Sequence, residues 1–136
     1  MRSLQKLNFL ESYRFKNSKI SVLLMTIKAA IFMNPNSGSL SWEKKLKRAE
    51  EAVKRLKSIF WYNGDIEVKI FEEPTKTKYD FQLLLREESK RRDVAVIGSG
   101  DGGFGDGLNH IDKKCILGYI PLGSGNNIQS AFFLHR

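Results

Sequence analysis

Three short polar segments of the chain combine glycine with asparagine, serine or aspartate. They are residues 34–38 (NPNSG), 98–103 (GSGDGG) and 121–127 (PLGSGNN), and each follows an apolar run. Glycine lets the backbone come close to a ligand, and the free N–H groups at the start of a helix attract anions. Three such segments at one edge of a fold predict a phosphate-binding site, whose simplest polyphosphate ligand is a nucleotide.

Each segment alone has an ordinary explanation. Asn-Pro-x-Ser-Gly is a common turn composition, and a glycine-rich connection often reflects only close packing. The hypothesis of a phosphate site therefore depends on the recurrence of such segments at successive strand ends. The chain has no Gly-Lys pair, which excludes a Walker phosphate loop.

Gly98, Gly100 and Gly103 fit the spacing G-x-G-x-x-G of dinucleotide-binding folds. Such folds have a ribose-binding acid about 20 residues later, but residues 119–122 (YIPL) at the next strand end contain none. The Asp101 carboxylate would also repel a phosphate about 4 Å away by about 4 kcal/mol at an effective dielectric constant of 20. A magnesium ion between the two charges would remove this penalty, so Asp101 favours a metal-dependent site.

The apolar patterns that separate these segments alternate between strand and helix. Short apolar runs predict strands at residues 28–33, 66–71, 93–97 and 115–120. Helical spacing predicts helices at residues 43–60, 80–91 and 108–111, and the start of another at 127–133. This order predicts an α/β fold with an open, mostly parallel sheet and helices on both faces. In such sheets ligands bind beyond the carboxyl ends of the strands.

The longest predicted helix, residues 43–60, has one apolar stripe and a basic remainder. The stripe consists of Leu46, Ala49, Val53, Leu56 and Phe60, which follow the spacing of one helical face. The basic residues are expected to lie off this stripe in solvent, and they are Lys44, Lys45, Lys47, Arg48, Lys54 and Lys57. Residues 1–58 hold 13 Lys and Arg against 4 acidic residues. Such a basic half attracts polyanions, although charge alone names no partner.

The length of 136 residues suits one domain or half of a two-domain enzyme. The one cysteine, Cys115, predicts a buried, unreactive thiol and a reducing compartment, and no apolar run approaches the ~20 residues of a membrane span. We therefore expect a cytoplasmic protein. Residues 1–24 are expected to form a basic, poorly ordered leader. The apolar run at residues 20–25 makes a poor signal peptide, and translation could start at Met1 or at Met25.

The three polar segments, in this order and at these distances, resemble the catalytic domain of diacylglycerol kinases. Sphingosine, ceramide and bacterial lipid kinases share that domain. The resemblance covers roughly residues 26–133 and implies the family's N-terminal, Rossmann-like nucleotide-binding domain. We therefore expect residues 25–136 to form this domain, without the second, β-rich domain that supplies the family's catalytic base and most of its lipid site.

The resemblance implies a nucleotide-binding set within the three segments. This set consists of Asn34, Ser37, Gly98, Gly100, Asp101, Gly102, Gly103, Gly123, Ser124, Gly125 and Asn126. Asp101 and Asp106 are expected near the metal. If the chain aligns with the family's Thr-Leu-Asn-Glu without a gap, Asp106 matches the glutamate. If the chain has an insertion there, Leu108-Asn109 matches the Leu-Asn instead.

The chain departs from the family pattern at four positions, and at one of them Ser124 replaces a threonine but keeps its hydroxyl. Ser99 replaces the first glycine of Gly-Gly-Asp-Gly-Thr, Gly103 replaces its threonine, and Asn127 replaces the aspartate of Gly-Thr-Gly-Asn-Asp. Loss of a threonine hydroxyl that bonds a charged group would cost about 1.5–3 kcal/mol.

The resemblance implies ATP and Mg²⁺ as cofactors and transfer of the γ-phosphoryl group to a lipid hydroxyl, with association at a membrane surface. No residue of this chain is expected to be catalytic, so the chain alone should have little activity without a C-terminal domain or partner chain. We expect a nucleotide as the partner and expect no specific binding of nucleic acid. The alternatives are an NAD kinase-like nucleotide-binding domain and a non-catalytic polyanion-binding module. The acceptor and the oligomeric state stay open.

Overall fold

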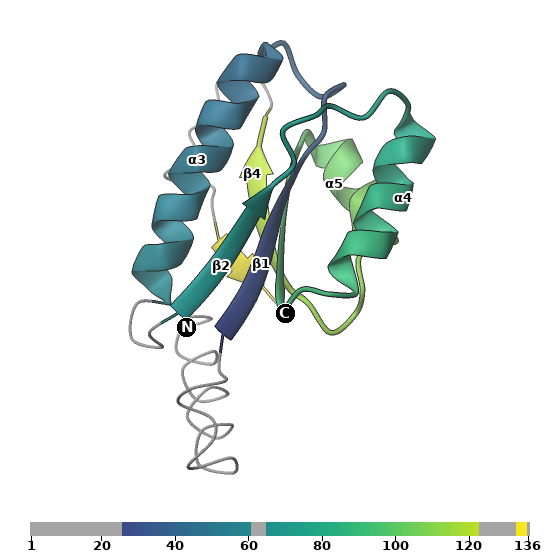
Figure 1. Ribbon diagram of the computed structural model, residues 1–136. Helices are drawn as coiled ribbons and strands as arrows, with labels where there is room; N and C mark the ends of the chain where they lie inside the picture. The colour runs from purple at the N-terminus through teal and green to yellow at the C-terminus, as the bar shows by residue number, and fades with distance from the viewer. Residues whose placement is uncertain (1–25, 61–64, 123–132, 136) are drawn as a thin grey trace, which may run out of the picture.

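The computed structural model describes residues 26–60, 65–122 and 133–135. These residues form a five-stranded sheet with the order β2-β1-β3-β4-β5, which Figure 1 shows between its helices. The strands are β1 (Thr26–Met33), β2 (Asp65–Ile70), β3 (Val94–Ser99), β4 (Ile116–Pro121) and β5 (Phe133–His135). Strands β1 to β4 are parallel, and β5 pairs antiparallel with β4. The predicted open, mostly parallel α/β sheet is confirmed.

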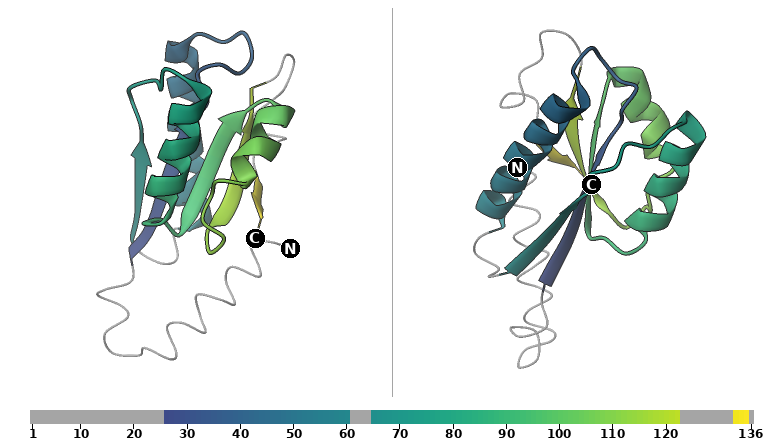
Figure 2. Two further views of the ribbon diagram at one scale, coloured as in Figure 1. Left: turned by 90° about the vertical axis from the view of Figure 1, so that its right-hand side faces the viewer. Right: turned by 45° about the horizontal axis from the view of Figure 1, so that its top comes forward.

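Helices cover both faces of this sheet (Figure 2). Helix α3 (Trp42–Ile59) lies on one face, whereas α4 (Lys78–Ser89) and α5 (Asp101–Leu108) lie on the other. The Ser41 hydroxyl caps α3 and the Thr77 hydroxyl caps α4, each by accepting a backbone N–H of the first turn. Such caps are worth about 1 kcal/mol each. In the described part of the chain, no helix combines the length and apolar character needed to cross a membrane.

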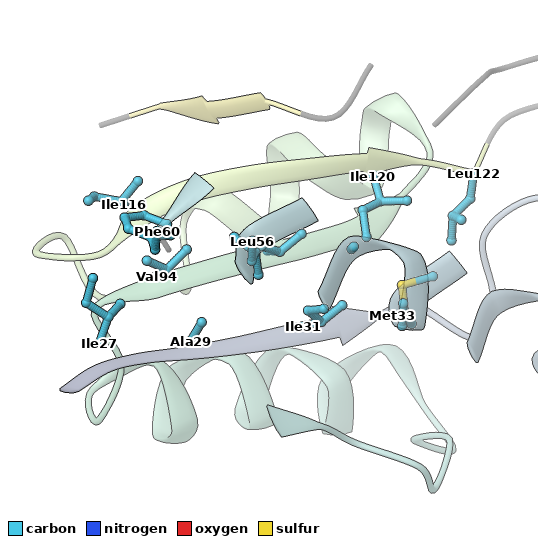
Figure 3. Close-up of a cluster of buried hydrophobic side chains, with 13 residues drawn as sticks. Ile27, Ala29, Ile31, Met33, Leu56, Phe60, Val94, Ile116, Ile120 and Leu122 are labelled. Atoms are coloured by element: carbon cyan, nitrogen blue, oxygen red, sulfur yellow. The ribbon is translucent and has the colours of Figure 1, made fainter. Parts of the chain in front are cut away.

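The sheet separates two apolar layers. The layer under α3, drawn in Figure 3, contains residues of β1, α3, β3 and β4, with Phe60 just after α3 and Leu122 just after β4. The layer under α4 and α5 contains Ala30, Phe32, Phe81, Leu85, Ala95, Ile97, Ile111 and Cys115. Strand β3 is therefore buried on both faces, as its continuous apolar sequence predicts, and β1 is buried on both faces from Ala29 onward. The Cys115 thiol is buried as predicted, and its Sγ donates to the Ser89 and Arg92 carbonyls.

One predicted helix is wrong, and a second is wrong at its last residue. The helix expected at residues 108–111 is instead α5, which begins at Asp101 and ends at Leu108. Glycine costs about 1 kcal/mol per residue inside a helix, but here it allows α5 to lie close to β3, since a Cβ at Gly107 would lie 3.1 Å from Ile97 Cδ1. The helix expected at residues 127–133 is wrong at Phe133, which pairs with Tyr119 in the sheet. Residues 127–132 lie outside the described residues.

Candidate functional site

The described parts of the three polar segments lie side by side at the carboxyl ends of β1, β3 and β4, at the top of Figure 1. The Asn34 N–H donates to the Gly98 carbonyl at 2.8 Å, which joins the first segment to the second. The Leu122 N–H donates to the Ser99 carbonyl at 3.0 Å, which joins the third segment to the second. The predicted convergence of these segments is therefore confirmed for residues 34–38, 98–103 and 121–122.

The glycines at 38 and 98 are explained by packing. Gly38 has φ +67°, in the left-handed region, and a Cβ there would lie 2.2 Å from the Leu122 carbonyl oxygen. A Cβ at Gly98 would lie 2.3 Å from Met33 Sδ. Gly98 is also part of β3 rather than of a loop. Its predicted role in nucleotide binding stays a prediction, but close packing alone accounts for glycine at this position.

Packing does not explain the glycines at the start of α5. A Cβ at Gly100 or Gly102 would have no atom within 4 Å. Gly100 is the N-cap of α5, and no side chain caps the helix by a hydrogen bond. The first N–H groups of a helix lack partners within the helix and carry its positive dipole end. This part of the edge thus combines backbone donors with open space, as an anion site requires.

Two departures from the family pattern lie against each other. A Cβ at Gly103 would lie 3.2 Å from Ser99 Cβ and 3.3 Å from Ser99 Oγ. The Ser99 hydroxyl donates to the Gly100 carbonyl at 2.9 Å. A serine at 99 therefore leaves little room for a side chain at 103, such as the threonine that the resemblance implies.

A cavity of about 180 Å³ opens beside this edge. Its lining comes from the first segment, α4 and α5, and consists of Asn34, Asn36, Lys78, Phe81, Gly102, Gly103 and Asp106. Lys78 is exposed and brings a positive charge, while Asp106 Oδ2 accepts a hydrogen bond from Gln82 Nε2 at 2.8 Å. Ligand pockets usually measure roughly 300–1,000 Å³, so this cavity has room for part of a nucleotide.

Both predicted metal residues lie on α5. Asp101 is the first residue of α5, and Asp106 lines the cavity. Leu108 and Asn109, which the alternative alignment matches to the family, do not line the cavity. The described residues contain no cluster of three His, Cys, Asp or Glu side chains suited to a metal ion. Magnesium usually takes only one or two protein carboxylates and fills its other positions with water and substrate phosphates, so a magnesium site does not require such a cluster. Residues 123–126 lie outside the described residues, and the roles predicted for Gly123, Ser124, Gly125 and Asn126 stay predictions.

One basic residue of α3 that the sequence places in solvent is buried. Lys45 is 1% exposed, and its Nζ donates to the Asn34 carbonyl at 3.1 Å and the Pro35 carbonyl at 2.7 Å. Arg48 Nη1 donates to the Pro121 carbonyl at 3.2 Å. The prediction of a solvated Lys45 is thus wrong, because these carbonyls at the sheet edge attract the ammonium group. Its spacing of four residues from Ala49 was a signal that this position belongs to the buried face.

Solved structures similar to this chain include a diacylglycerol kinase from Bacillus anthracis str. Sterne, with 21% identity, 74% of this chain covered and a TM-score of 0.48. A candidate diacylglycerol kinase from the same strain has 21% identity, 72% coverage of this chain and a TM-score of 0.47. The matches cover 35% and 33% of those chains, so this chain spans about a third of their length. A search of curated proteins found no match. The family model of the diacylglycerol kinase catalytic domain matches residues 28–136, and the chain therefore belongs to that family.

Proposed function

We propose that the edge at the carboxyl ends of β1, β3 and β4 is the ATP-binding half of a lipid-kinase site. The observation that supports this proposal is the start of α5, where Gly100 and Gly102 leave open space beside a cavity lined by Asn34. Free N–H groups and the positive helix end favour phosphate oxygens there. Lys78, which also lines the cavity, adds a positive charge.

Magnesium belongs to the same proposal. Asp101 and Asp106 would hold the ion together with the phosphates of ATP. When bound, Mg²⁺ neutralises the charge of the phosphates and so lowers the barrier to phosphoryl transfer. The Asp106 side chain is already oriented by its hydrogen bond with Gln82.

The proposed reaction moves the γ-phosphoryl group of ATP to a lipid hydroxyl. Phosphoryl transfer depends on groups that position both donor and acceptor, and the acceptor side of the site would come from a further domain or a partner chain. This chain alone is therefore proposed to bind ATP weakly and to turn over little. Exposed lysines of α3 would suit anionic headgroups at a membrane surface, and they are Lys44, Lys47, Lys54 and Lys57.

Substitution of Gly102 by valine tests the ATP site. Because a Cβ at Gly102 meets open space, Gly102→Val should leave stability within about 0.5 kcal/mol, since valine is the better helix former. The added methyl groups should weaken binding of ATP with Mg²⁺ by about 10-fold or more, equivalent to ~1.4 kcal/mol. The measurement is titration followed by backbone amide NMR signals of residues 100–103.

Gly105→Val is the matched control, because Gly105 also faces open space on α5 but does not line the cavity. It should bind ATP as the unaltered chain does. Amide signals of residues 100–103 that do not respond to ATP with Mg²⁺ would reject the proposal. Binding of polyphosphate that needs no Mg²⁺ and is unchanged in Asp101→Ala would favour the polyanion-binding alternative, and tighter binding of NAD than of a lipid by the complete protein would favour an NAD kinase.

A further inference from the structure

Lys45 lies on the buried face of α3, where lysine is uncommon. Its side chain is buried, and among the described residues no carboxylate lies within ion-pairing distance of its Nζ. Burying an ammonium without a counter-ion is unfavourable, and desolvation lowers the pKa of Lys45. A methionine of similar length would fill the same space without that cost. The ammonium group therefore does something that an apolar side chain could not do.

The contacts of Lys45 show what this is. Its Nζ binds two consecutive main-chain oxygens, those of Asn34 and Pro35, at the turn that follows β1. The described peptide bonds are all trans, and in a trans peptide the C=O and the N–H point in opposite directions. A Pro35 carbonyl held toward α3 therefore turns the Asn36 N–H away from α3, toward the Asn34 side chain.

The Asn36 N–H donates to Asn34 Oδ1 at 3.0 Å. With its oxygen held in this way, the Asn34 carboxamide presents its nitrogen to the start of α5, where a Cβ at Gly103 would lie 3.3 Å from Nδ2. Asn34 and Gly103 both line the cavity. A continuous path of contacts thus runs from Lys45 through the Pro35–Asn36 peptide to a donor at the cavity.

We propose that Lys45 is a positioning residue that fixes the Asn34 carboxamide with its N–H₂ group toward the cavity, where it donates to a phosphate oxygen of the ligand. The proposal rests on the proposed function for the identity of the ligand. Its structural part, the orientation of Asn34, does not depend on any ligand. Lys45 acts only through Asn34, and it touches no part of the nucleotide.

The test compares Lys45→Met with Lys47→Met, which removes the same charge from an exposed position of α3. In the ligand-free chain, Lys45→Met should shift the NMR signals of the Asn34 N–H₂ group and the Asn36 amide, and Lys47→Met should not. Binding of ATP with Mg²⁺ should weaken about 10-fold in Lys45→Met, as expected for loss of one hydrogen bond to a charged group. Lys47→Met should change it less than about 2-fold, since exposed charges are screened. Adenosine, which lacks phosphate, should bind both variants alike.

A double-mutant cycle with Asn34→Ala separates positioning from a general loss of stability. If Lys45 acts through Asn34, the double variant should bind ATP no more weakly than Asn34→Ala alone. Additive losses would overturn the proposal, and so would unchanged Asn34 signals in folded Lys45→Met. If Lys45→Met does not fold, Lys45→Arg serves as the second variant, because it keeps the charge and the N–H donors. It should keep both the Asn34 NMR signals and the affinity for ATP. Loss of these signals and of the affinity in folded Lys45→Arg would overturn the proposal. An unaltered chain that binds no ATP would refute the proposed function, while the ligand-free signals would still decide the role of Lys45.

Discussion

Two groups of glycines lie at the same edge of the sheet for different physical reasons. At Gly38 and Gly98 a Cβ would lie 2.2 Å from the Leu122 oxygen and 2.3 Å from Met33 Sδ. At Gly100 and Gly102 a Cβ would meet nothing within 4 Å. The first group lets the turns and strands come together, whereas the second leaves space in front of backbone donors. The surroundings of each glycine in a glycine-rich motif therefore have to be compared before that glycine is assigned to ligand binding.

Gly38→Ala should produce the largest effect on stability. It places a side chain at φ +67° and against the Leu122 backbone, which cannot move as freely as a side chain. We expect a loss of at least about 2 kcal/mol in the free energy of unfolding, from backbone strain and overpacking together. Urea denaturation measures it, with Ser39→Ala at the neighbouring exposed position as the control. A loss as small as that of Gly102→Val would remove the distinction between the two groups.

Gly103→Thr, which introduces the residue expected from the family pattern, should have an intermediate effect. Ser99 is too close for an added Cβ to fit without movement, so the single substitution should cost about 1–2 kcal/mol. In a Ser99→Gly chain the same substitution should cost less than half as much. Thermal or urea unfolding of the unaltered chain, the two single variants and the double variant gives the coupling energy between positions 99 and 103. Equal costs in both backgrounds would show that Ser99 and Gly103 do not compensate.

The smallest expected effect is a pH dependence caused by Lys45. Burial places the folded-state pKa of Lys45 below its ordinary value of 10.5. Between these two pKa values the unfolded chain binds more protons than the folded chain, so this group's contribution to the unfolding free energy rises with pH. The unaltered chain should therefore gain stability relative to Lys45→Met as the pH is raised from neutral toward 10.5. Urea denaturation of both proteins at several pH values checks this, and a parallel pH dependence would contradict it.

Much of the architecture could be predicted because it depends on local patterns. The apolar runs of β1 and β3 and the alternating order of strands and helices are properties of neighbouring residues, and they lead directly to a parallel sheet with its segments at one edge. The start of α5 could not be found in this way. Each of its glycines disfavours a helix locally, and only the nearness of β3, at Gly107 and Ile97, makes small residues an advantage.

The role of Lys45 was hidden for a different reason. Its partners are the main-chain oxygens of Asn34 and Pro35, and carbonyl groups are present at every residue of any sequence. No side-chain pairing or charge pattern therefore distinguishes Lys45 from the exposed lysines of α3. Only its register with Ala49 and Ala52, which are both buried, separates it from them.

The edge strand β2 has a consequence for handling the protein in solution. Its Ile66, Val68 and Ile70 face the α3 layer, while the alternate positions Asp65, Glu67 and Lys69 are exposed. Charged side chains on an edge strand hinder the addition of a foreign strand to its backbone. These three charges thus oppose fibre-like self-association of copies of the chain, and engineering for higher yield or for crystals should keep them.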